Sequence, residues 1–595
     1  MAPNGAVIAQ EQSAKPPCRR ARREAAALAF LLAVAAGGAS SFSVMYGLAR
    51  TPSGALFMWS ADPADNNGYF AKMRAGYRGD WRTTMLYTSE PHEPVFLFPF
   101  HVALGHVAAL YRDYRTWRTG QEPPACETIP KVYNATRVCL VIALMMTVYW
   151  FSGFLTARPW RRVWAVAFAA FAGGWSGLPW PVGAFGYTPP NTETSVMKSC
   201  ILFPNFAASL IFYLMACAAF VNAMKRPSQR RSVAWAALAG LGLGWVHPFD
   251  SPPLCAIGAV ALAWRWLQTR RFPRTLFASV AAFTVFTGGP ILQQILIRNK
   301  MEMFRIIDEQ NALWWNHWWE WARMLDVYLA AAAVGLAVLW KRRRRPEAMF
   351  ILVWVAVGLA MVNVPVRFQR RMIEGVPMGL AFATVAGIEG ALVRPLVRWL
   401  GRLRMRRGEG QRAEGLRAAN ARVAVGRLRF ALYTAALLLL TPGTARVLYD
   451  TSAGCFSRPS NYYYIERPEA DALEWLEKHS DWREAVWGEK FRANSIPYLS
   501  GHRVFYGLDA ETIHSREKLA WTQEFFSWKM PVEKFRRICR DYGVKYVYFG
   551  AREKLYDPVL HRDIGAYDPK TLELAYPRQF AGKPAVSIYR VKSEW

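Results

Sequence analysis

The sequence predicts a polytopic α-helical membrane protein that ends in a small C-terminal α/β domain. Long apolar runs recur along its first 443 residues, and arginine and lysine gather in the short segments between these runs. After residue 443 the composition becomes that of an ordinary soluble domain with nearly balanced charge. This division explains how a chain that is 53% hydrophobic also carries a formal net charge of +31.

Eleven apolar runs approach the ~17 to 25 residues that cross a bilayer as a helix. Basic clusters follow the second, fourth, sixth, eighth and tenth runs, and such clusters mark cytoplasmic loops. We therefore expect a cytoplasmic N-terminus at 1–24, a transmembrane domain at 25–443 and an extracytoplasmic domain at 444–595, in a bacterial inner (plasma) membrane. The runs lie at 25–48, 132–157, 163–179, 199–222, 232–247, 251–267, 275–297, 324–341, 347–365, 373–393 and 424–443.

Nucleic-acid-binding proteins and zinc proteins fit this sequence poorly. Basic clusters that are separated by membrane-length apolar runs cannot form one continuous groove for nucleic acid without breaking the spans. Eight cysteines without a CxxC or Cys/His spacing argue against a zinc site.

The segment 94–111 is also apolar, but counting it as a crossing would move every later basic cluster to the outer side. We interpret it as an interfacial or re-entrant helix inside a long outer loop at about 49–131.

This first outer loop contains the main catalytic candidates. Asp62 precedes Pro63, a pattern typical of a helix start, and glycines at 76 and 79 would end that helix. Asp65 and Tyr69 then lie on one face at i, i+4 spacing, with Asp65 in the first turn. Helix capping alone would also explain both carboxylates.

Cations also occur where the charge rule does not expect them. Arg367, Arg370 and Arg371 lie between the ninth and tenth runs, on the expected outer side. Arginine binds phosphate in bidentate fashion, although such arginines also snorkel to lipid headgroups. At the outer end of the fifth run, His247 and Asp250 flank a helix break; they are functional candidates, or polar groups that satisfy broken backbone.

The first loop resembles that of the GT-C membrane glycosyltransferases, which include protein O-mannosyltransferases and lipid A aminoarabinose transferases. The similarity rests on the Asp65-x-x-x-Tyr69 helix that ends in Gly-Asp-Trp, and on Glu-Pro-His92-Glu93-Pro opening an amphipathic helix that ends near 104–105. A further point of similarity is the arginine segment ahead of Pro377 in a late span.

The resemblance implies a polyprenyl-phosphate sugar donor, a glycan, lipid or protein acceptor, and a carboxylate that serves as base or positions the acceptor. Asp65 matches the acidic motif of this superfamily, but Asn66 stands where a glutamate is usual, unless Asp62 replaces it. The resemblance places Tyr69, His92 and Glu93 in the substrate-binding set and leaves open a divalent cation, magnesium or manganese.

In the C-terminal region, β-rich runs at 484–488, 502–507, 544–550 and 585–591 alternate with helical patterns at 468–479 and 532–542. They predict an α/β domain that handles the acceptor or stabilises the outer loops. Two other functions remain open for the whole chain: a transporter or flippase of a lipid-linked or anionic substrate, and a non-catalytic envelope scaffold. Transporters generally contain paired inverted repeats, and we find none here.

Overall fold

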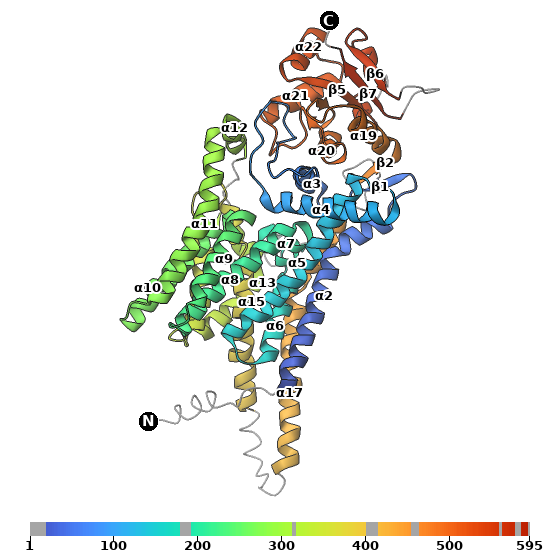
Figure 1. Cartoon of the computed structure of the whole chain (residues 1–595). Coiled ribbons are helices and arrows are strands. Elements are labelled where there is room, and N and C mark those ends of the chain that lie inside the picture. Colours follow the sequence, from blue (N-terminus) through green and yellow to red (C-terminus); the bar gives the residue numbers. More distant parts are fainter. Residues whose placement is uncertain are drawn as a thin grey trace.

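The computed structural model describes residues 19–178, 192–311, 317–399, 414–453, 463–557, 562–577 and 585–592. Most of the expected N-terminal segment 1–24 therefore lies outside the described residues. The described chain forms a helical bundle below, a sheet-bearing unit above, and two helices of the first loop between them (Figure 1).

A helix occupies each of the eleven predicted ranges. Seven helical stretches among the described residues are long and apolar enough to cross a membrane, which makes the chain a multi-pass membrane protein. The crossing number of eleven stays a prediction, because α6, α9 and α14 have only 13, 16 and 16 residues. The helices are α2 (Arg19–Ala49), α5 (Ala125–Leu155), α6 (Pro159–Phe171), α8 (Pro204–Lys225), α9 (Arg231–Val246), α10 (Ser251–Thr269), α11 (Arg274–Lys300), α13 (Trp318–Trp340), α14 (Pro346–Met361), α15 (Val376–Gly387) and α17 (Glu414–Leu440).

The centre of the bundle is α8. Within its apolar window 83% of the residues are buried, compared with 11% for the window that ends α17. A helix that is apolar on all sides suits either protein or lipid neighbours, so burial identifies which helices are central. The short α7 (Val196–Leu202) precedes α8 and leads into its N-terminal end.

The first loop folds into β1 (Ala55–Phe57), α3 (Pro63–Tyr77) and α4 (Pro99–Thr119). The predicted end of the second helix near 104–105 is wrong, because α4 continues to Thr119. Gly105 is instead a crossing point: a Cβ atom there would lie 2.0 Å from the carbonyl oxygen of Met73 on α3. Gly76 makes the reciprocal approach, 2.0 Å from the Val102 carbonyl.

The C-terminal unit contains a five-stranded sheet of order β4-β3-β5-β7-β6. Strand β3 is parallel to β4 and β5, whereas β7 pairs antiparallel with β5 and β6. Its elements are β2 (Tyr464–Glu466), α19 (Arg467–His479), β3 (Ala485–Trp487), α20 (Lys490–Leu499), β4 (Arg503–Val504), α21 (Ser515–Phe526), α22 (Val532–Asp541), β5 (Val544–Phe549), β6 (Leu572–Tyr576) and β7 (Ser587–Val591).

This unit is joined to the bundle through α18 (Pro442–Ala453), which packs along α2. The hydroxyls of Ser43 and Thr451 are 2.9 Å apart, and the Ser452 hydroxyl donates to Ser43 Oγ at 3.1 Å. Strand β2 pairs antiparallel with β1, with Leu56 opposite Ile465.

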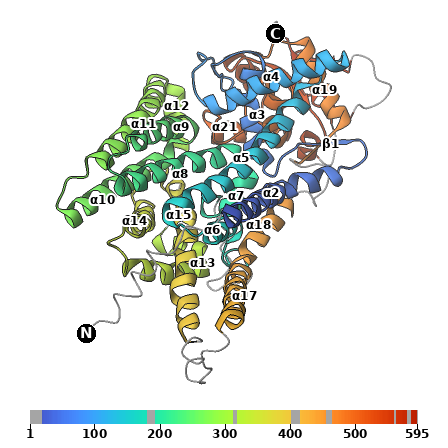
Figure 2. The same cartoon turned by 60° about the horizontal axis from the view of Figure 1, so that its bottom comes forward.

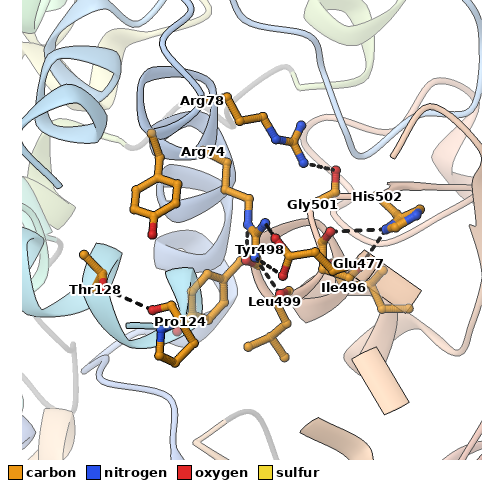
Figure 3. A network of polar contacts seen from close by, with 12 residues as sticks. Arg74, Arg78, Pro124, Thr128, Glu477, Ile496, Tyr498, Leu499, Gly501 and His502 are labelled. Carbon is orange, nitrogen blue, oxygen red and sulfur yellow. Dashed lines mark hydrogen bonds and ion pairs between the residues drawn. The ribbon is translucent and has the colours of Figure 1, made fainter. Parts of the chain in front are cut away.

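Helix α3 is fastened to the C-terminal unit by Arg74 (Figure 3). Its Nε donates to the Tyr498 carbonyl at 2.7 Å and its Nη2 to the Leu499 carbonyl at 2.6 Å, while Glu477 pairs with the same guanidinium. Arg78 lies one turn further on and reaches the Gly501 carbonyl at 3.4 Å. A buried arginine that donates in several directions fixes α3 firmly against α20.

Candidate functional site

The N-terminal end of α3 carries two neighbouring carboxylates, as the sequence predicted. Asp62 is the residue before Pro63, and Asp65 lies in the first turn and is exposed. Burial, followed by the negative charge of Asp65, raises the pKa of Asp62 to about 6. A carboxyl with this pKa changes charge close to neutral pH, as a general acid or base requires.

Lys198 on α7 is a cation whose charge acts on Asp62. Burial lowers the pKa of Lys198, and the charges of Glu193 and Asp62 act in the opposite direction. The ammonium group therefore lies within the electrostatic field of Asp62 although 136 residues separate the two positions. The sequence marks Lys198 only as a weaker candidate, because no periodic pattern links residues 196–202 with the start of α3.

The arginine segment forms a 3-10 helix, η3 (Gln369–Ile373), beside the same region. Arg370 Nε lies 3.6 Å from Glu193 Oε1, and the Arg371 guanidinium stacks 4.4 Å from the ring centre of Phe249. Both Asp65 and Arg371 act on Tyr69: burial raises the pKa of its hydroxyl, Asp65 raises it further and Arg371 lowers it. Charges from α3 and from η3 therefore act on the same tyrosine hydroxyl.

Behind η3, two buried carboxylates converge on one histidine. His247 Nδ1 lies 3.0 Å from Asp250 Oδ2 and 3.2 Å from Glu374 Oε2. The Ser209 hydroxyl of α8 lies 3.0 Å from Asp250 Oδ2 and 3.3 Å from Glu374 Oε1. His247 and Asp250 were predicted, whereas Glu374 was missed because it reads as the polar start of a span.

A chain of aromatic rings links the carboxylate pair with this cluster. The rings of Tyr69 and Phe203 have centres 5.5 Å apart, and those of Phe203 and Phe206 are 5.2 Å apart. The Phe206 ring then meets the His247 ring edge-on at 4.8 Å. The candidate site therefore extends from the start of α3 to the junction of α9 and α10.

No protein-family model matches the chain, and no curated protein does. Solved structures do match: the apo oligosaccharyltransferase of Archaeoglobus fulgidus aligns over 93% of this chain and 73% of its own, with a TM-score of 0.51 and 10% identity. The structure of AglB from the same organism, in complex with an inhibitory peptide and a dolichol-phosphate, gives 0.50, 11% identity, and coverage of 93% and 72%. The chain shares the fold of these two solved structures.

ArnT from Cupriavidus metallidurans, bound to undecaprenyl phosphate, is a further similar structure. It aligns over 93% of this chain and 98% of its own, with a TM-score of 0.47 and 12% identity. At identities of 10 and 11%, the two oligosaccharyltransferase structures show a shared fold and no residue roles.

One departure from the GT-C acidic motif has a structural explanation. Asn66 is buried and turned away from Asp65, because its Oδ1 accepts from the Tyr133 hydroxyl at 2.8 Å and its Nδ2 donates to Ser60 Oγ at 2.6 Å. A glutamate there would bury a charge beside a tyrosine hydroxyl. Asp62 is the second carboxylate next to Asp65.

Three predicted substrate-binding residues lie away from this centre. His92 occupies the loop before α4, with Nε2 accepting from the Met85 amide at 2.9 Å and Nδ1 2.8 Å from the Glu90 carbonyl oxygen. Both ring nitrogens therefore hold the loop, and Glu93 beside it is exposed. Arg367 is turned toward α12 (Glu302–Gln310), where its Nη1 donates to the Asp308 carbonyl at 3.3 Å.

The cluster of His247, Asp250 and Glu374 is the donor set that suits a metal ion among the described residues. One ligand atom from each lies within 4.8 Å of the others. Oδ1 of Asp250 is buried and has no hydrogen-bond partner, so the cluster retains a free ligand atom. Two carboxylates and an imidazole fit a divalent cation.

Proposed function

We propose that the protein is a glycosyltransferase that moves a sugar from a polyprenyl-phosphate donor to a glycan, lipid or protein acceptor of the cell envelope. The observation that carries the proposal is the gathering of opposite charges at one end of the bundle: Asp62 and Lys198 act on each other, and Asp65 and Arg371 both act on Tyr69. Carboxylates for an acceptor hydroxyl and cations for a departing phosphate are the two demands of this reaction.

In the proposed reaction, Asp65 takes the proton of the acceptor hydroxyl or orients it, with Asp62 beside it. The hydroxyl oxygen then bonds to the anomeric carbon while the bond from that carbon to the phosphate oxygen breaks. The electron pair of that bond stays with the phosphate, whose charge Arg370 and Arg371 stabilise. Arg367 would meet the more distant part of the donor, given its contact with α12.

A divalent cation would be held by His247, Asp250 and Glu374. When bound, it would supply positive charge to the donor phosphate as a Lewis acid. The residues themselves orient one another through the Ser209 hydroxyl and the His247 imidazole.

The setting we propose is a bacterial inner membrane that the chain crosses eleven times, with the C-terminal unit outside. This orientation puts the basic loops in the cytoplasm, as the charge rule requires. It also puts the start of α3 at the outer face, where a lipid-linked donor presents its sugar. The AglB structure with a dolichol-phosphate bound supports a donor lipid of this class, and we propose a hexose or a pentose as the transferred sugar.

The test is transfer of radiolabelled sugar from synthetic polyprenyl-phosphate donors by the purified protein in lipid. Removing a general base costs about 10²- to 10⁴-fold in rate, so we expect Asp65→Asn to lose transfer by this factor. Arg371→Ala should lose transfer as well, while Asp113→Asn at an exposed position of α4 serves as the matched control and should keep it.

Unchanged turnover in Asp65→Asn would contradict the catalytic assignment. Donor left intact by the wild-type protein across a broad panel would contradict transferase activity altogether. In that case, movement of intact donor between leaflets would support the transporter alternative, and no movement would support a scaffold.

A further inference from the structure

A cavity of about 490 Å³ lies at the end of the bundle opposite to α3. It is bounded by the C-terminal ends of α5, α8 and α13 and by the N-terminal ends of α6 and α14. Helix α3, by contrast, packs near the N-terminal end of α5, where Asn66 meets Tyr133. Figure 2 brings this lower end forward, and the cavity is separate from the candidate site.

The lining of this cavity carries a large excess of positive charge. Seven of its residues are arginine or lysine and two are glutamate. The positive-inside rule explains why cations occupy loops at this end of the bundle, but not why they converge on one cavity. Because like charges around a shared space repel one another, an anion in that space would lower their free energy.

The two glutamates already have cationic partners. Glu389 is buried and accepts from Arg161 Nη2 at 2.5 Å, and Glu347 Oε2 lies 3.4 Å from Lys225 Nζ. They neutralise a minority of the charge and hold two walls in place. Glu389 also lies in η4 (Ile388–Val393), a π-helical turn, and such turns frequently accompany functional sites.

The remaining lining is apolar. Leu155, Val338 and Ile351 contribute to it, together with Phe382 and Val385 of α15. A cavity with apolar walls and a basic lining suits an amphiphilic anion better than a small inorganic ion. The apolar walls distinguish this cavity from a cluster of arginines on a solvated surface.

We propose that this cavity binds the phosphate of an anionic lipid headgroup. Arginine guanidinium groups match phosphate oxygens in bidentate geometry, and basic pockets between transmembrane helices bind lipid headgroups of this kind. Free pyrophosphate offers the same phosphate chemistry without acyl chains, so the test includes it as a separate arm. The proposal does not depend on the transferase reaction.

The experiment is native mass spectrometry of the full-length, delipidated protein, titrated with cardiolipin, with phosphatidylcholine or with pyrophosphate. The site variant is Arg342→Ala with Arg345→Ala, because both residues line the cavity. The matched control is Arg343→Ala with Arg344→Ala, which removes the same charge from the same loop at positions outside the lining. Should the site variant fail to fold, Arg345→Glu replaces it.

We expect cardiolipin to bind the wild type and the control pair, and the site variant at least about tenfold more weakly. If only pyrophosphate bound, and the site variant weakened its binding, the cavity would be a phosphate site for a soluble ligand. Three results would overturn the proposal: wild-type affinity in the site variant, an equal loss in the control pair, or equal binding of phosphatidylcholine.

Discussion

Asp62 and Asp65 place two carboxylates in different surroundings, one partly buried and one exposed. Asp65 is exposed at the start of α3, whereas Asp62 is partly buried and has its pKa raised to about 6. Two carboxylates in unequal surroundings are a common basis for separate roles in proton transfer. Lys198 limits the pKa rise at Asp62 by favouring its charged form.

The raised pKa of Asp62 predicts a pH dependence of activity. If its carboxylate form is needed, kcat/KM of the wild type should rise through a pH near 6 and level off above it. The residual activity of Asp62→Asn should lack this rise. The measurement is a pH profile of transfer for both proteins from about pH 5 to about pH 8, a range that includes this pKa.

The same shift predicts the sign of a stability effect. Between about pH 4 and 6 the folded protein binds more protons at Asp62 than the unfolded chain, so stability falls as pH rises through this window. Asp62→Asn removes the penalty, on the order of 2–3 kcal/mol. Its thermal midpoint should therefore gain on the wild type from pH 4 to about 6, and a constant difference would contradict the shift.

The sequence patterns singled out candidate residues of the site, but they did not show how these residues are arranged in space. Arg371 stands out because it breaks the charge rule for outer loops, and Asp65 because it lies in the part of the first loop that resembles the GT-C acidic motif. Glu374 was missed and Lys198 was only a weaker candidate, because their partners lie on elements that meet only in the folded bundle. The inward turn of Asn66 also depends on a distant partner, Tyr133.

At the scale of elements, the crossing of α3 over α4 determines where the carboxylates lie. Gly76 and Gly105 let the two backbones approach without side chains between them. A Cβ at either position would meet a backbone carbonyl oxygen at 2.0 Å, and backbone cannot move aside as a flexible side chain can. The crossing therefore fixes the direction of α3.

We predict that Gly76→Ala lowers the thermal midpoint and transfer activity together, at a cost of about 1–3 kcal/mol or more. The measurement is a melting curve of the purified protein beside its transfer assay. Gly288→Ala on α11 is the control, because a Cβ there meets nothing within 4 Å. Equal melting curves for the two variants would contradict the role of the crossing.

Most elements were predictable because their periodicity is local. Apolar runs indicated the bundle helices, and the strand pattern at 544–550 became β5 (Val544–Phe549). Gly105 misled the prediction of a helix end, because a glycine that permits a close crossing looks in sequence like one that stops a helix. Strand β6 was missed because it is a half-exposed edge strand without an apolar run.

At the scale of the whole molecule, the first loop and the C-terminal unit share one hydrophobic core. Phe70 and Met73 of α3 belong to the same buried cluster as Ile496 and Tyr498 of α20. The sequence suggested that the C-terminal unit stabilises the outer loops or handles the acceptor, and its direct contact with α3 favours the first role. Local patterns cannot reveal a core that residues more than 400 positions apart build together.

We predict that Arg74→Ala loosens the C-terminal unit from α3. It leaves the Tyr498 and Leu499 carbonyls without their donor and Glu477 without its partner, which should cost about 2–4 kcal/mol. Limited proteolysis should then cut between bundle and sheet faster than in wild type. Arg78→Ala is the comparison variant: it loses one longer bond to Gly501 and a contact with the Trp482 ring at 4.8 Å, and it should lose less protection than Arg74→Ala.

The pairing of β1 with β2 has a consequence for how the protein is made. Ala55 leaves the ribosome 411 residues before its partner Glu466, a delay on the order of 20–80 s at typical rates of synthesis. During this interval the first loop lacks β2 and the core residues of α20 that pack against it. The site can therefore be completed only after the C-terminal unit has been synthesised. A prematurely terminated chain would insert its helices, but its α3 would lack the core residues of the C-terminal unit.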